Sequence, residues 1–176
     1  PPPDGYYGPG QVLTFTLMWS EAVTVTGTPH LPFTIGGVPH NAATAGGTGV
    51  ATLQFTYTIQ PGDNAAAGIV LGANLDMGSG EIHDRGSNDA VTTLPATTTS
   101  GVVIDTTPPV LLAMSPPAAG LYRAGAVLDW VTIWREPLVA GGTPTATLQM
   151  GTAGVDAVLI AGSGTLTLTF RYTVQP

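Results

Sequence analysis

The chain of 176 residues contains no cysteine and no lysine, and its few charged residues are mostly acidic. The absence of cysteine excludes disulfides, thiolate metal sites and cysteine nucleophiles. Four arginines face 11 carboxylates, which gives a formal net charge of −7. Proteins that bind nucleic acid need basic side chains to neutralise phosphates, so we expect no nucleic-acid partner. An anionic membrane surface is an equally poor match.

Long apolar runs and helical periodicity are also missing. The longest apolar stretch, "AAAGIVLGANL" at 65–75, is much shorter than the roughly 18–20 residues of a membrane span, so no membrane insertion is expected. No nucleophile elbow, phosphate-binding glycine loop or histidine metal motif occurs. The carboxylate pairs Glu81/Asp84 and Asp84/Asp89 fall in a narrow loop region that offers little cleft. The sequence therefore predicts a protein that is not an enzyme.

Alternation of apolar and polar residues is the main pattern that the sequence does contain. In "VATLQFTYTI" at 50–59, leucine, aromatic residues and isoleucine share one face, and threonine and glutamine share the other. "GTLTLTFRYTV" at 164–174 repeats this pattern. Further strands are expected at 11–19, 22–26, 31–35, 68–75, 89–94 and 100–104, separated by Gly- and Pro-rich turns. The pattern predicts an all-β fold built from antiparallel β-sandwiches.

The sequence also repeats itself at an offset of 115 residues. Aligning 5–61 with 120–176 without a gap gives about 21 identities in 57 positions, among them Trp19 with Trp134 and Tyr57 with Tyr172. We therefore expect a first domain at 1–106 and a second at 107–176. Pro108 and Pro109, at the join, favour a short and stiff connector.

The second repeat includes only the N-terminal half of the pattern. The first copy continues past "QP" at 60–61 into several more predicted strands, whereas the second reaches "QP" at 175–176. Half a sandwich leaves a core face and a sheet edge uncovered. Two explanations stay open: the second repeat is truncated here, or another copy of the chain completes it by donating strands.

Several motifs resemble the tandem immunoglobulin-like repeats of large bacterial surface adhesins and related exported proteins. They are "GYYGPG" at 5–10, "VTVTGTP" at 23–29, "QPGD" at 60–63 and "VVIDTTPP" at 102–109. The resemblance implies tandem immunoglobulin-like sandwiches, the second one incomplete. It also implies a non-enzymatic extender that is secreted to the cell surface, where it serves cell adhesion and has neighbouring repeats as partners.

Many proteins of this kind bind Ca²⁺ at carboxylates near loops and junctions. The resemblance therefore makes Asp84, Asn88, Asp89 and Asp105 candidate calcium ligands. For the first three, a tight turn stabilised by the Asp84 side chain is the competing interpretation. For Asp105, the competing interpretation is a cap on the connector. Where such repeats often have an aspartate-rich loop after the "QP" turn, this chain has alanines at 65–67.

Two functions of other classes remain open from the sequence. A carbohydrate-binding module could present Trp19 and Trp134 as stacking platforms, although their recurrence at one repeat position favours a role in the core. A subunit of an extracellular filament could accept a strand from a neighbour at the incomplete repeat.

Overall fold

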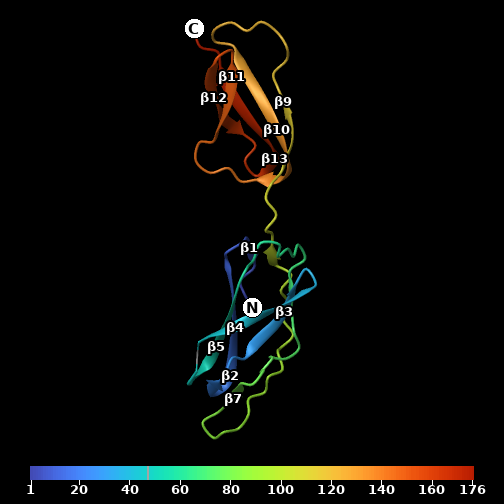
Figure 1. Cartoon of the computed structure of the whole chain (residues 1–176), viewed down its shortest axis with the longest axis vertical. Helices are drawn as coiled ribbons and strands as arrows, with labels where there is room; N and C mark the ends of the chain where they lie inside the picture. Colours follow the sequence, from blue (N-terminus) through green and yellow to red (C-terminus); the bar gives the residue numbers. More distant parts are fainter. Residues whose placement is uncertain (47) are drawn as a thin grey trace. The chain divides into compact units, whose positions relative to one another are not determined.

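The computed structural model describes residues 1–46 and 48–176, and within these residues it contains thirteen strands and no helix (Figure 1). The prediction of an all-β fold with several antiparallel sheets, as in a β-sandwich, is confirmed. The chain divides into two compact units, Pro1–Thr107 and Pro108–Pro176. Unit 1 contains β1 (Gly5–Tyr7), β2 (Val12–Thr26), β3 (His30–Ile35), β4 (Val38–Gly46), β5 (Val50–Thr58), β6 (Ile69–Leu71), β7 (Glu81–His83) and β8 (Val102–Ile104). Unit 2 contains β9 (Leu111–Ser115), β10 (Val127–Leu138), β11 (Thr145–Met150), β12 (Ala153–Ala161) and β13 (Thr165–Thr173).

Unit 1 is organised around a six-stranded sheet in the order β6-β3-β4-β5-β2-β7, with β1 and β8 forming a separate parallel pair. The alternation expected for 50–59 is present: Leu53 and Phe55 of β5 are fully buried, and Gln54 between them is exposed. Phe55 lies opposite Phe15 of β2, and the ring of Phe15 packs 5.1 Å from that of Phe33 in β3. These phenylalanines form the centre of the core of unit 1.

Two expected strands differ from the structure. The strands expected at 11–19 and 22–26 are one continuous strand, β2, whose pairing with β5 is interrupted by a bulge between Met18 and Val23. A bulge bends a strand without ending it, so one strand reads as two in the sequence. The segment at 89–94 forms isolated bridges, Asn74 with Thr93 and His83 with Asp89, instead of a regular strand.

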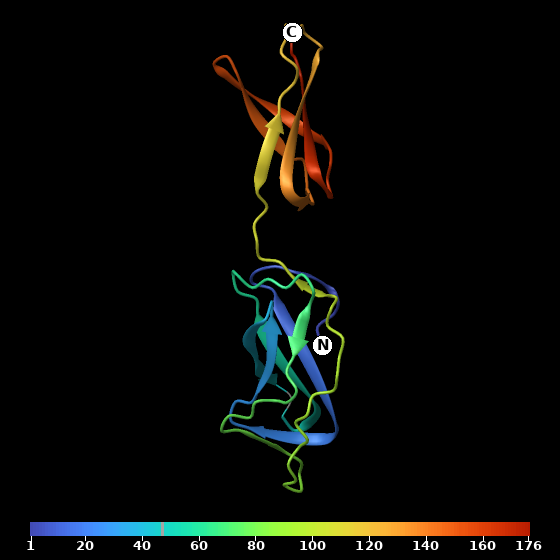
Figure 2. The same ribbon diagram turned by 90° about the vertical axis from the view of Figure 1, so that its right-hand side faces the viewer.

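Unit 2 is a five-stranded sheet in the order β11-β12-β13-β10-β9 (Figure 2). Its pairings match those of unit 1 at an offset of 115 residues. Leu13 pairs with Tyr57 in unit 1, and Leu128 pairs with Tyr172 in unit 2. The bulge in β2 recurs in β10, between Ile133 and Leu138. The two units therefore share one four-stranded arrangement, β2 to β5 in unit 1 and β10 to β13 in unit 2.

The units differ in what covers this shared sheet. In unit 1 the segment after β5 adds β6, β7 and β8 and contributes Ile69, Ile82 and Ile104 to the core. Among the described residues of unit 2, no strand follows β13, and its buried cluster is much smaller. That cluster consists of Ala157, Leu168 and Phe170, with partly buried neighbours.

A matched pair of glycines allows this difference to be tested. Gly27 and Gly142 have φ angles of +65° and +67°, and a Cβ added to Gly27 would lie 2.6 Å from the Cα of Gly80, whereas one added to Gly142 would meet nothing within 4 Å. Both alanine substitutions should carry the left-handed penalty of about 1–2 kcal/mol. Gly27→Ala should lose more, because the backbone of Gly80 must also shift. Hydrogen exchange, which reports on each unit separately, measures the two losses; equal losses would contradict the close approach.

Candidate functional site

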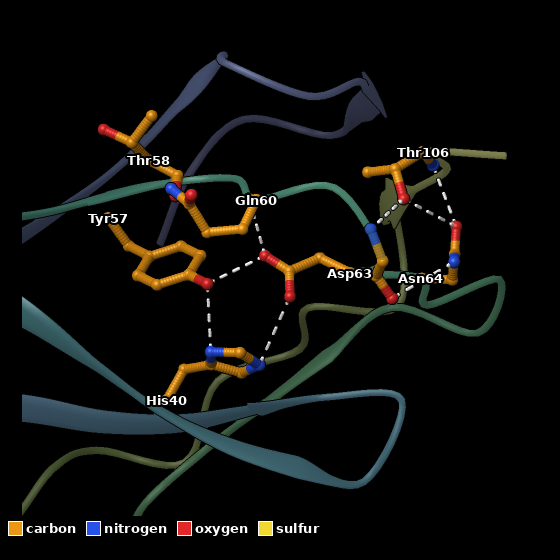
Figure 3. A network of polar contacts seen from close by, with 8 residues as sticks. His40, Tyr57, Thr58, Gln60, Asp63, Asn64 and Thr106 are labelled. Atoms are coloured by element: carbon orange, nitrogen blue, oxygen red, sulfur yellow. Dashed lines mark hydrogen bonds and ion pairs between the residues drawn. The ribbon is translucent and has the colours of Figure 1, made fainter. Parts of the chain in front are cut away.

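The most connected group of polar side chains joins His40 of β4, Tyr57 of β5 and Asp63 of the following turn (Figure 3). The Tyr57 hydroxyl donates a hydrogen bond to Asp63 Oδ2 at 2.8 Å and lies 3.0 Å from His40 Nδ1. His40 Nε2 lies 3.5 Å from Asp63 Oδ1. His40 and Tyr57 meet because β4 and β5 are neighbours in the sheet. We call these three residues the His40 cluster.

Aromatic packing holds the tyrosine of this cluster in place. The Tyr57 ring meets Phe33 edge-on, with centroids 5.2 Å apart, and meets His40 edge-on at 5.0 Å. Partial burial raises the pKa of Tyr57 to about 12, and the hydrogen bond to the Asp63 carboxylate adds to this effect. A phenolate beside a carboxylate is disfavoured in such surroundings. Tyr57 is therefore a hydrogen-bond donor throughout the ordinary pH range.

Asp63 uses the same carboxylate to close the turn after β5. Its Oδ2 accepts a hydrogen bond from the backbone N–H of Gln60 at 2.8 Å, and its own N–H donates to the Gln60 carbonyl at 3.1 Å. Oδ2 thus accepts from both Gln60 and Tyr57, while Oδ1 faces His40. The turn is bound to strands β4 and β5 through one side chain.

The next residue in the turn connects it to the end of unit 1. Asn64 Oδ1 accepts a hydrogen bond from the backbone N–H of Thr106 at 2.8 Å, and the Thr106 hydroxyl accepts one from the N–H of Gly62 at 2.9 Å (Figure 3). Ala65 pairs with Ile104 of β8 through a bridge. The His40 cluster and Asn64 together fix residues 104–106, which lead directly into the connector.

This arrangement does not resemble a catalytic centre. A general acid or base must reach a substrate in a cleft, and both oxygens of Asp63 already face groups of the protein. The His40 and Asp63 side chains are only 17% and 10% exposed. The geometry supports a positioning role, in which the cluster sets the conformation of the turn.

The candidate calcium ligands lie in two places within unit 1. Asp84, Asn88 and Asp89 lie in the turn that follows β7, at the end of unit 1 remote from the β1–β8 pair (Figures 1 and 2). Asp105 directly follows β8. The structure therefore brings the first three together and leaves Asp105 apart from them.

The Asp84 carboxylate serves the turn itself. Its Oδ1 accepts the backbone N–H of Asn88 at 2.8 Å and its Oδ2 accepts the Asn88 side-chain amide at 2.7 Å. These hydrogen bonds from Asn88 hold the pKa of Asp84 below its ordinary value. Ser87, between them, has a φ of +64°, as a tight turn requires.

No group of three or more histidine and acidic side chains in the described part of the chain is placed to hold a metal ion. Asp105 Oδ1 accepts the N–H of Thr107 at 2.9 Å, as a cap on the connector would. Because these oxygens already have protein partners, calcium binding stays a prediction of the sequence.

The tryptophans pack on the cores of their units. Trp19 is half-buried against the core of unit 1, although it also borders a hollow of about 220 Å³ with Glu21 and Asp89. Trp134 is half-buried in unit 2, and its indole N–H donates to the Thr132 hydroxyl at 2.9 Å. This packing favours the core role over exposed stacking platforms.

Sequence reasoning missed the His40 cluster. The sequence places His30 and His40 at the two ends of a hairpin, whereas in the structure His40 turns to Tyr57 and Asp63. Tyr57 reads as a core residue by alternation, and the hydrogen bond of its hydroxyl has no signal in the sequence. The aspartate at the third position after Gln60 is the one available sign, since it suits a turn closed by a side chain.

Tyr57→Phe tests the positioning role. Removal of the hydroxyl leaves the Asp63 carboxylate without its donor from β5, and a hydrogen bond to a charged group contributes about 1.5–3 kcal/mol. We expect unit 1 to lose about 1–2 kcal/mol and the amides of 60–65 to exchange faster. Tyr172→Phe is the matched control, because Val155 stands where His40 does in unit 1. Equal losses in the two variants would contradict a role for the cluster.

Alkaline unfolding gives a second test. Tyr57 has a pKa of about 12 in the folded protein against 10.0 ordinarily, so the folded state holds the proton more tightly. Its contribution to stability is complete below pH 10.0 and is lost as the pH rises toward about 12. The free energy of unfolding, measured with urea across this window, should fall more steeply in the native chain than in Tyr57→Phe. Parallel curves would contradict the raised pKa.

No helix in the part of the chain that the structure describes is long and apolar enough to cross a membrane. Comparison of the chain with protein-family models, with curated proteins and with solved structures finds no match. The function is therefore argued from the chain's own geometry.

Proposed function

We propose that this chain is a non-enzymatic extender from an exported bacterial adhesin or extracellular fibre, made of tandem immunoglobulin-like sandwich units. The observation that carries the proposal is the length of chain between the units. Only Pro108 and Pro109 separate the last residue that is hydrogen-bonded within unit 1 from the first that is hydrogen-bonded within unit 2, among the residues described.

On the side of unit 1, each residue after β8 has a backbone partner. The N–H of Asp105 donates to the Tyr7 carbonyl at 3.0 Å, the N–H of Thr106 donates to Asn64, and the N–H of Thr107 donates to Asp105. The turn held by the His40 cluster supplies the Asn64 partner. The start of the connector is thus part of the folded unit.

On the side of unit 2, the chain is held again directly after the prolines. The Val110 carbonyl accepts the N–H of Arg135 at 2.9 Å, and β9 begins at Leu111. Each proline ring fixes its φ near −65° and restricts the residue before it. Few free backbone torsions remain between the units, which favours a stiff link over a flexible tether.

The composition fits the same role. Only 9% of the residues are charged, and threonine takes their place on many exposed strand positions. We infer that the partners are neighbouring units of the same protein at the cell surface. Carbohydrate binding has less support, because both repeat-equivalent tryptophans pack on cores.

The stiffness of the link can be measured directly, because the chain has no cysteine of its own. Spin labels at Ser79→Cys and Thr152→Cys, both exposed positions, report the distribution of distances between the units. We expect a narrow distribution in the native chain and a clearly broader one when Pro108 and Pro109 are both replaced by glycine.

The matched control replaces Pro116 and Pro117, which lie within unit 2, by glycine and should leave the distribution narrow. A native distribution as broad as that of the Pro108→Gly/Pro109→Gly variant would overturn the extender proposal.

A further inference from the structure

The outer edge of β11 in unit 2 is bare where unit 1 has a paired strand. In unit 1, β6 pairs antiparallel with β3, placing Leu71 opposite Phe33 and Ile69 opposite Ile35. β11 is the counterpart of β3, since its pairing with β12 repeats that of β3 with β4 at an offset of 115 residues. Yet β11 is the end strand of its sheet among the described residues.

Side chains along this edge are exposed where their counterparts are buried. Ile35 is 2% exposed beneath β6, whereas Met150, at the equivalent position, is 38% exposed. Phe33 is 2% exposed, and its counterpart Leu148 is only half-buried. Unit 2 therefore keeps apolar side chains at positions that have no cover.

The backbone also leaves room for a covering segment. A Cβ on Gly36 would lie 2.4 Å from the Asn64 carbonyl oxygen in unit 1, while one on Gly151 would meet nothing within 4 Å. The two glycines have similar φ angles, +56° and +64°, so the turn has the same form in both units. The space that Asn64 fills in unit 1 is open in unit 2.

The edge carries none of the features that usually prevent strands from pairing. Proteins protect exposed edges with lysine, proline or inward-pointing charges. β11 reads "TATLQM" and contains no charged residue and no proline, whereas β3, which is covered, has a proline at Pro32. An uncharged edge with unpaired backbone groups is a template for one more strand.

We propose that the outer edge of β11 is a docking site for an extended polypeptide segment with the residue pattern of 64–71, "NAAAGIVL". The segment adds antiparallel to β11 as β6 adds to β3, with one apolar side chain opposite Met150 and the next opposite Leu148. Its turn before the strand passes over Gly151. This inference compares the two units directly and does not rest on the extender role.

The occupant is a segment that belongs to neither unit of this chain or of a second copy. To donate its own β6, a second copy would have to expose Ile35 and Ile69, which are 2% and 3% exposed when paired. Fully exposing such side chains costs roughly 1.5–3 kcal/mol each. A free segment of the same pattern binds without that loss.

The test uses a labelled synthetic peptide with the sequence of 62–75, titrated into the intact chain. We expect saturable binding of one peptide per chain, with slower hydrogen exchange at 145–150. A control peptide with aspartate at the positions of Ile69 and Leu71 should bind at least about tenfold more weakly, or about 1.4 kcal/mol. Met150→Lys, at an exposed position, should weaken binding of the native peptide to a similar degree.

Three outcomes would overturn the proposal. The native and control peptides could bind equally or not at all, which would remove the apolar recognition. Protection could appear at β3 instead of β11, which would mean that the peptide displaces β6 of unit 1. Finally, the chain alone could self-associate with rising concentration and protect 145–150, which would make a second copy the occupant.

Discussion

The pairing of β2 with β5 is the interaction on which the rest of unit 1 depends, and β10 with β13 repeats it in unit 2. It places Phe15 opposite Phe55 and so turns both strands' apolar faces to one side. Because side chains alternate along a strand, a register shift by one residue would move this whole set to the solvent face. The same register also determines where β5 ends, and hence which residues form the turn after it.

That turn links the sheet to the connector. Tyr57 lies near the end of β5, with its ring against Phe33 and its hydroxyl on Asp63. Asp63 closes the turn, and Asn64 then binds Thr106. Core packing is in this way transmitted through three polar contacts to the residue two positions before Pro108. The connector is short because the folded unit extends up to it, and the prolines restrict what remains.

The parts of this structure that the sequence predicts are those encoded by local patterns. Alternation in 50–59 identifies β5 and its buried residues, and the offset of 115 residues matches the register of both sheets. The His40 cluster depends on the pairing of β4 with β5 and on a turn beyond it, which no local pattern encodes. The spacing of Asp84 and Asn88 fits both a calcium loop and a turn, since spacing alone does not tell which oxygens the protein itself uses.

The two units together serve as an internal comparison that a single sandwich would lack. Leu168 and Phe170 are 5% and 8% exposed, close to the values of their counterparts Leu53 and Phe55, because β10 and β12 flank β13 in both directions. Met150 departs furthest from its counterpart because its cover in unit 1 comes from outside the four shared strands. Exposure in unit 2 therefore rises with dependence on β6 and not with residue type. An apolar residue that gains burial only from a missing neighbour contributes little to the unit by itself, at roughly 25 cal/mol for each Å² removed from water. Its contribution begins when a strand occupies the edge of β11.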